Sequence, residues 1–240
     1  MTISRLRTLR FAGTATALSF LTLLLAAEPD PGLLKARDQQ NLHALDGIIA
    51  EEKKAAEANG SSAEAQYNSA LAYSYAAEVA QELRDKRKAE SYAVAGIEVA
   101  RKAVAGNGSN AEYHRLLGSL CGQVIPSNPL MGALKYGNCA RDEIDKAISL
   151  DGNLALAYVS RGVGNFYLPA QMGGGLELAM KDIDKALALN PKLTEAYLWK
   201  GVILRKANRN RDAREAFSEA LKLDPGRLWA KQQLEKTPAQ

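Results

Sequence analysis

The two cysteines are the residues whose spacing most directly indicates covalent chemistry. Cys121 and Cys139 are the only cysteines in the chain, with seventeen residues between them. We expect one on a helix and the other at the start of the next helix, so that they meet at the same end of a helical hairpin. In an oxidising compartment this predicts a disulfide that stabilises the intervening loop by about 3 kcal/mol. Two separate buried thiols are the alternative, and redox catalysis is not expected because CxxC is absent.

A glycine-rich stretch and the two histidines are the next candidates for chemistry. Met172–Gly175 reads MGGG before a predicted helix start, where free amides and the helix dipole favour an anion. The Lys-Ser/Thr of a phosphate loop is missing, so a permissive turn is the main interpretation. His43 and His114 do not have the spacing of metal ligands, and we expect His114 to be a packing residue.

Catalytic constellations are not indicated. Asp142, Glu143 and Asp145 cluster on a predicted helix, where a solvated outer face is expected rather than a catalytic carboxylate pair. Nothing resembles a nucleophile elbow or a Ser-His-Asp triad. The sequence therefore predicts a protein that is not an enzyme and that uses no cofactor and no metal.

The net charge does not indicate nucleic-acid binding. The chain has 31 basic and 27 acidic residues, giving a formal charge of +4. Arg5, Arg7 and Arg10 lie in the first 27 residues, which contain no Asp or Glu. Without that segment, 28 basic residues face 27 acidic ones, which is too balanced for a phosphate-binding surface.

Residues 1–27 predict export. Three arginines precede an apolar run from Phe11 to Ala27, and charge returns at Glu28. This is typical of a secretory signal peptide. Cleavage after Ala27 places Leu25 where a small residue is preferred, so an uncleaved membrane anchor remains the alternative. We expect a periplasmic or secreted protein that contacts the membrane only through an uncleaved N-terminal segment.

The rest of the chain has helical periodicity. Leu33–Ala58 predicts one long helix, which would serve as an N-terminal lid. We therefore divide the chain into a linker and lid helix (28–62), a series of helices (63–236) and a short tail (237–240).

The stretch from Thr194 to Pro225 shows the repeat that organises these helices. Its small residues, which let two antiparallel helices approach closely, are Gly201, Ala213 and Ala220, and its bulky ones are Tyr197, Leu204 and Phe217. Pro225 cannot continue the second helix. This pattern resembles the tetratricopeptide repeat (TPR), specifically that of an exported bacterial-type TPR protein. Earlier repeats end at Gly108, Gly152 and Pro191, at intervals that shorten to the standard 34 residues.

The resemblance implies an all-α fold: a TPR-type solenoid of about four helical hairpins, wound as a right-handed superhelix. An N-terminal lid helix and a C-terminal capping helix would close its ends. In this family the first helix of each hairpin lines a concave groove. The corresponding residues here are Tyr67, Leu71, Tyr75, Arg115, Gln123, Val163, Phe166, Tyr167, Arg205 and Lys206.

The predicted groove is aromatic and apolar at its centre and basic at its C-terminal end. Such a surface suits an extended peptide or helix with an acidic end. The alternative is that the aromatic residues pack against the lid helix or the inserted loops. We therefore expect an exported scaffold that binds a protein or peptide partner of the cell envelope. The second hypothesis is an accessory helical component of a periplasmic solute-transport system, partnering a substrate-binding protein.

Overall fold

The computed structural model describes residues 30–60 and 62–239. These residues form helices and turns but no strand, so the all-α prediction is confirmed. The α-helices are α1 (Pro31–Asp38), α2 (Leu42–Ala58), α3 (Ala63–Glu82), α4 (Lys86–Gly106), α5 (Ala111–Val124), α6 (Pro129–Leu150), α7 (Ala155–Tyr167), α8 (Leu176–Leu189), α9 (Thr194–Lys206), α10 (Asn210–Leu223) and α11 (Leu228–Lys236). Two 3₁₀ helices, η1 (Ile125–Ser127) and η2 (Ala170–Met172), lie between them. The predicted signal peptide or anchor, residues 1–27, lies outside the described residues.

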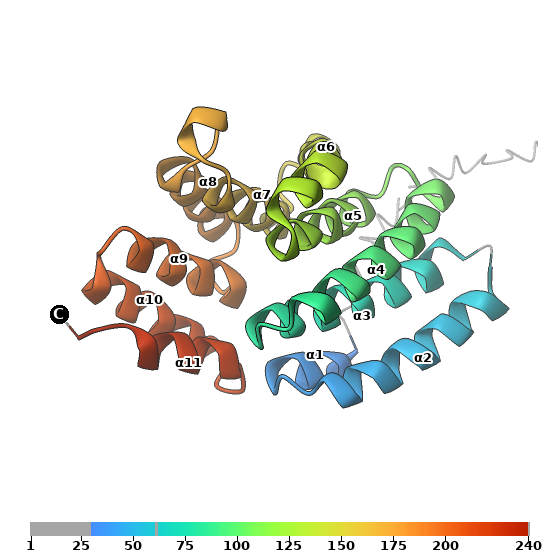
Figure 1. Cartoon of the computed structure of the whole chain (residues 1–240), viewed down its shortest axis with the longest axis horizontal. Coiled ribbons are helices and arrows are strands. Elements are labelled where there is room, and N and C mark those ends of the chain that lie inside the picture. The colour runs from blue at the N-terminus through green and yellow to red at the C-terminus, as the bar shows by residue number, and fades with distance from the viewer. Residues whose placement is uncertain (1–29, 61, 240) are drawn as a thin grey trace, which may run out of the picture.

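The helices pack as consecutive hairpins. α3 pairs with α4, α5 with α6, α7 with α8, and α9 with α10. Figure 1 shows these hairpins laid side by side along an arc. The first helices α3, α5, α7 and α9 also contact one another in that order. We call the surface that they form the inner face.

Glycines set the close approach within the hairpins. A Cβ on Gly201 would lie 2.5 Å from the Phe217 ring, and one on Gly118 would lie 2.7 Å from Ile144. Both distances are too short for a real contact, so only glycine permits this spacing. Ala213 and Ala220 are completely buried beside Phe217. The small-and-bulky pattern of the last repeat is therefore confirmed.

The loops within the hairpins differ in length. Leu83–Asp85 makes a tight turn between α3 and α4, so the extra residues of this repeat lengthen its helices. The connection between α7 and α8 runs from Leu168 to Gly175 instead. Within it, Gly173 and Gly175 have φ values of 88° and 111°, which side-chain-bearing residues rarely adopt. The glycine-rich stretch thus forms a turn that requires glycine.

The prediction of a single long helix over Leu33–Ala58 was wrong. The chain forms α1 and α2 with a break at Gln39–Asn41, where Gln40 has a φ of 53°. The Asn41 side chain accepts a hydrogen bond from the Ala44 backbone N–H at 3.0 Å and so begins α2. α1 contacts both α2 and α3.

The two ends of the described chain lie close together. In Figure 1 the blue helix α1 lies beside the red helix α11, so the arc of hairpins nearly closes on itself. The Gln232 side chain on α11 donates to Gln40, which follows α1, at 2.9 Å. Within the described ranges, no helix is both long enough and apolar enough to cross a membrane.

Candidate binding surface

The N-terminal part of the predicted groove makes internal hydrogen bonds. The Tyr67 hydroxyl on α3 donates to Glu112 on α5 at 3.0 Å, and Arg115 donates to the same carboxylate at 2.6 Å. Burial raises the pKa of Tyr67, and the neighbouring Glu112 carboxylate raises it further. Leu71 is 4% exposed and belongs to the core. These predicted groove residues therefore hold α3 against α5.

Gln123 takes part in the same contact. Its side-chain amide donates to the Ser74 carbonyl at 3.2 Å, and Gln81 donates to the Gln123 carbonyl at 2.7 Å. Further along α5, the hydroxyls of Ser119 and Ser160 lie 2.9 Å apart and link α5 to α7. Polar residues thus connect neighbouring first helices across the inner face.

Tyr75 lies against α1 rather than against an open groove. The Arg37 guanidinium is 4.9 Å from the Tyr75 ring centroid, and it donates to Glu195 on α9 at 2.7 Å. Burial raises the pKa of Tyr75 to about 12. Burial disfavours the Arg37 charge, but Glu195 and Glu78 outweigh it and raise the pKa of Arg37. Burial also opposes ionisation of Glu195, yet Arg37 holds the pKa of Glu195 below its usual value.

Arg227, at the start of α11, makes a second contact between the ends. Its side chain is 1% exposed and donates to Glu78 at 2.5 Å and to Glu82. The Gln40 amide also donates to Glu82, at 2.8 Å. We call Arg37, Glu78, Glu82, Glu195 and Arg227 the closure cluster. A repeat pattern does not predict this cluster, because its contacts join residues more than 100 positions apart.

Where α7 and α9 of the inner face meet α11, four aromatic rings are in contact. We call Phe166, Tyr167, Trp199 and Trp229 the aromatic cluster. Trp199 lies 5.9 Å from Phe166, 6.2 Å from Tyr167 and 5.8 Å from Trp229, measured between ring centroids. Tyr167 is 55% exposed, and the other three rings are half-buried. The predicted groove includes Phe166 and Tyr167 but neither tryptophan, although Trp199 lies on α9, which carries other predicted groove residues.

The remaining predicted groove residues have different environments. Val163 on α7 is half-buried and packs against the apolar cluster that α7 shares with α8 and α9. Arg205 donates to the Gln233 side chain at 2.6 Å, and burial lowers the pKa of Arg205. Lys206 is exposed at the end of α9. Of the two predicted basic groups, Arg205 is therefore bound internally, whereas Lys206 faces solvent.

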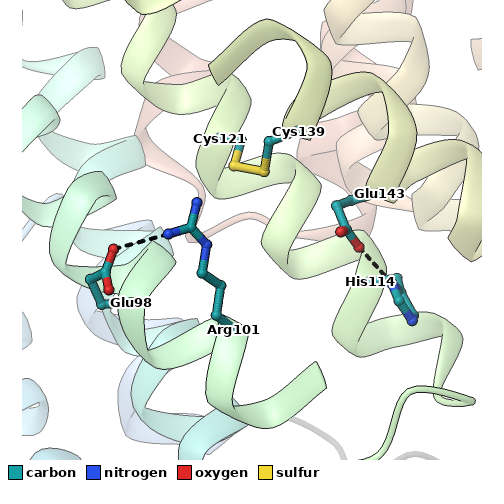
Figure 2. The surroundings of a disulfide bond; sticks show 6 residues. All are labelled: Glu98, Arg101, His114, Cys121, Cys139 and Glu143. Atoms are coloured by element: carbon teal, nitrogen blue, oxygen red, sulfur yellow. Dashed lines mark hydrogen bonds and ion pairs between the residues drawn. A yellow bond between two sulfur atoms is a disulfide. The ribbon is translucent and has the colours of Figure 1, made fainter. Parts of the chain in front are cut away.

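The second hairpin contains a disulfide. Cys121 on α5 and Cys139 on α6 are bonded, with a Cα–Cα distance of 6.0 Å (Figure 2). His114 lies on the same hairpin, with Nδ1 2.5 Å from Glu143 and Nε2 3.0 Å from the Gly108 carbonyl oxygen. His114 therefore packs inside its repeat. Among the described residues, no group of three or more His, Cys, Asp or Glu could hold a metal ion.

The hairpins and their inner face define a helical-repeat protein of the TPR type. Residues 194–227 match the tetratricopeptide repeat family, which confirms the predicted resemblance to the TPR itself. Residues 33–168, more than half of the chain, match the family described as regulator of microtubule dynamics protein 1-3. The chain belongs to this family.

Known proteins are similar to parts of the chain or to its fold. Regulator of microtubule dynamics protein 3 from Bos taurus is 34% identical over 89 residues, which cover 37% of this chain and 18% of that protein. The chain thus spans less than a fifth of the length of this relative. A thermophilic TPR protein from Thermus thermophilus shares the fold at 18% identity, covering 87% of this chain and 97% of its own, with a TM-score of 0.59. YrrB, described as a TPR protein with an unusual peptide-binding site, has 18% identity and a TM-score of 0.42, with coverage of 87% and 92%.

Proposed function

We propose that this protein is a non-catalytic scaffold that binds a protein or peptide partner at the aromatic cluster of its inner face. The observation that carries this proposal is the contact of four aromatic rings with Tyr167 55% exposed. Large aromatic side chains with one accessible face contribute strongly to protein–protein binding, because they bury much apolar area at little entropic cost.

The geometry narrows the groove predicted from the sequence. Tyr67 and Arg115 are engaged within the repeats, so they offer little to a partner. Lys206 lies seven residues after Trp199 on α9, which places it about 10 Å further along the helix. A partner that packs an apolar side chain on the aromatic cluster and places a carboxylate near Lys206 fits this surface.

Truncating the exposed ring tests the proposal. Tyr167→Ala should reduce capture of the partner from cell extract at least tenfold, because the exposed ring is lost. Leu178→Ala on α8 is the matched control, since Leu178 is also a large exposed apolar residue, at 41%, but lies on a second helix. Equal capture of the partner by both variants and by the unchanged chain would contradict binding at the aromatic cluster.

The proposed location of the partner is the cell envelope, and it is supported only by the arginines and apolar run of residues 1–27. Fractionation of cells that make the full chain, with N-terminal sequencing of the recovered protein, distinguishes a cleaved signal from an anchor. The solute-transport hypothesis predicts a melting temperature that rises with an organic acid or hydrophobic solute. No shift with any solute would leave the peptide scaffold as the better proposal.

A role in microtubule dynamics is the second candidate function. The family match over residues 33–168 favours it, and the Bos taurus relative carries the same description. The test is co-sedimentation of the purified chain with polymerised tubulin. A chain that stays in the supernatant at every tubulin concentration would exclude direct binding. The two candidates require different compartments, so the fractionation experiment also separates them.

A further inference from the structure

α1 is a short helix held in place by one buried face. It has eight residues, too few for an isolated helix to be stable in water. Leu33, Ala36 and Arg37 are 4–5% exposed, whereas Lys35 on the opposite face is exposed. The contacts of this one face therefore determine where α1 lies.

The surface that receives α1 combines three kinds of contact. Glu195 on α9 accepts from Arg37 at 2.7 Å, and Tyr75 on α3 stacks beneath the guanidinium. Leu33 and Ala36 pack in the same apolar cluster as Leu71. We call Leu71, Tyr75 and Glu195 the α1 cradle. A carboxylate, an aromatic ring and an apolar side chain together select a helix with an arginine, a small residue just before it and a leucine one turn earlier.

The cradle is built from residues of the inner face. Tyr75 and Leu71 lie on α3 and Glu195 on α9, so the helices that form the inner face also hold α1. The occupant of the cradle is thus a helix of this chain, and its sequence gives the chemistry that the cradle accepts.

α1 is followed by a short connection to α2. The connection is Gln39–Asn41, with the left-handed Gln40 between the two helices. The hairpins from α3 onward do not depend on this connection for their own pairing. Rotation about Gln39–Asn41 would move α1 off the cradle without separating the hairpins from α3 onward, although it would break the contacts of α1 with α2 and those of Gln40 with Glu82 and Gln232.

We propose that the α1 cradle binds an arginine-bearing amphipathic helix of a partner protein and that α1 is its intramolecular competitor. This inference goes beyond the proposed function, because it places a second protein-binding site at the cradle, separate from the aromatic cluster. A short tether keeps α1 at an effective concentration in the millimolar range, so the partner binds weakly until α1 is released. When α1 leaves the cradle, Glu195 loses its ion pair with Arg37. An arginine of the partner helix then pairs with Glu195 in place of Arg37.

The test uses a release variant, Leu33→Ala with Arg37→Ala in the full chain, and a labelled peptide with the sequence of residues 30–41. Fluorescence anisotropy should show the peptide binding the release variant at least tenfold more tightly than the unchanged chain. Adding Glu195→Gln to the release variant should lower peptide affinity at least tenfold. A peptide with Arg37→Gln should bind the release variant as weakly as the unchanged peptide binds the unchanged chain.

A release variant that melts cooperatively but binds the peptide no better than the unchanged chain overturns the proposal. If that variant does not fold, hydrogen exchange on the unchanged chain decides: excess peptide should accelerate exchange of the α1 amides and not those of α3. Unaltered α1 exchange overturns the proposal as well. Tyr167→Ala acts on the separate aromatic cluster. If Tyr167→Ala loses partner capture but the peptide does not bind the release variant, the proposed scaffold function is supported and only the cradle proposal is rejected.

Discussion

At the scale of single residues, Arg227 has the strongest case for a structural role. Its side chain is 1% exposed, and carboxylates of Glu78 and Glu82 from a distant helix surround it. Removing one partner from a buried ion pair leaves an uncompensated charge, which is much costlier than losing an exposed pair. The guanidinium of Arg227 thus determines whether the buried Glu82 carboxylate and the half-buried Glu78 carboxylate remain neutralised.

We predict that Arg227→Ala lowers the free energy of unfolding by about 3 kcal/mol. Arg211→Ala is the matched control, because Arg211 pairs with Glu215 on the surface with its side chain 87% exposed. The control should change stability by less than about 0.5 kcal/mol. Urea denaturation monitored by circular dichroism measures both, and equal losses would argue against a structural role for the closure cluster.

Titration of Glu82 makes the free energy of unfolding depend on pH. Burial raises the pKa of Glu82 to about 7, although Arg227 opposes the shift, and Glu78 raises it further. Burial also raises the pKa of the nearby Asp38. The folded chain therefore binds a proton that the unfolded chain has already lost, so the contribution of Glu82 to stability is greatest below about pH 4.5 and is lost as the pH rises through about 7.

The free energy of unfolding should accordingly decrease between about pH 5 and pH 8, and Glu82→Gln should flatten that decrease. The glutamine cannot titrate, and it can still accept from Arg227 and Gln40. Urea denaturation at several pH values measures the slope. Glu219→Gln, which changes an exposed pair with Lys222, should keep the slope of the unchanged chain. If Glu82→Gln and the unchanged chain show the same change of unfolding free energy with pH, Glu82 is not the group responsible for it.

At the scale of helices, the packing within a hairpin depends on the absence of single methyl groups. The Phe217 ring occupies the space beside Gly201, whereas nothing lies within 4 Å of a Cβ built on Gly164. Alanine favours the helix over glycine by about 1 kcal/mol in both places. Packing and helix propensity therefore act in opposite directions at Gly201 and not at Gly164.

Gly201→Ala should destabilise the chain by about 1–3 kcal/mol, because the new methyl group clashes with a buried ring. Gly164→Ala should instead stabilise it by about 0.5–1 kcal/mol. Thermal melts of the two variants provide the comparison. A stabilising Gly201→Ala would show that α9 and α10 can separate freely, against the close packing described for the last repeat.

Helix pairing could be predicted from the sequence because each contact lies within about 40 residues. The small and bulky residues of Thr194–Pro225 encode the hairpin directly, and all of them are buried except Tyr197, which is half-buried. The break between α1 and α2 was missed because Gln39 and Gln40 are not helix breakers. Asn41 was the available signal, since its side chain caps α2.

At the scale of the whole molecule, the contact between the two ends could not be predicted. Repeats determine how each hairpin stacks on the next, but the position of the last hairpin depends on the sum of many small rotations. Arg37 and Glu195 are 158 residues apart in the sequence. The same reason accounts for the position of Tyr75, because the closing of the arc places α1 against that ring.

Opening the arc is the corresponding prediction. Arg37→Glu with Arg227→Glu places like charges at the closure cluster, so the ends should separate while the hairpins stay paired. Small-angle scattering should then show a larger maximum dimension, with helical content by circular dichroism unchanged. Lys35→Glu with Arg211→Glu makes the same charge change at exposed positions and should leave the dimension unaltered. If Arg37→Glu with Arg227→Glu leaves the maximum dimension unchanged, then apolar contacts of α1, and not its arginine, hold the ends together.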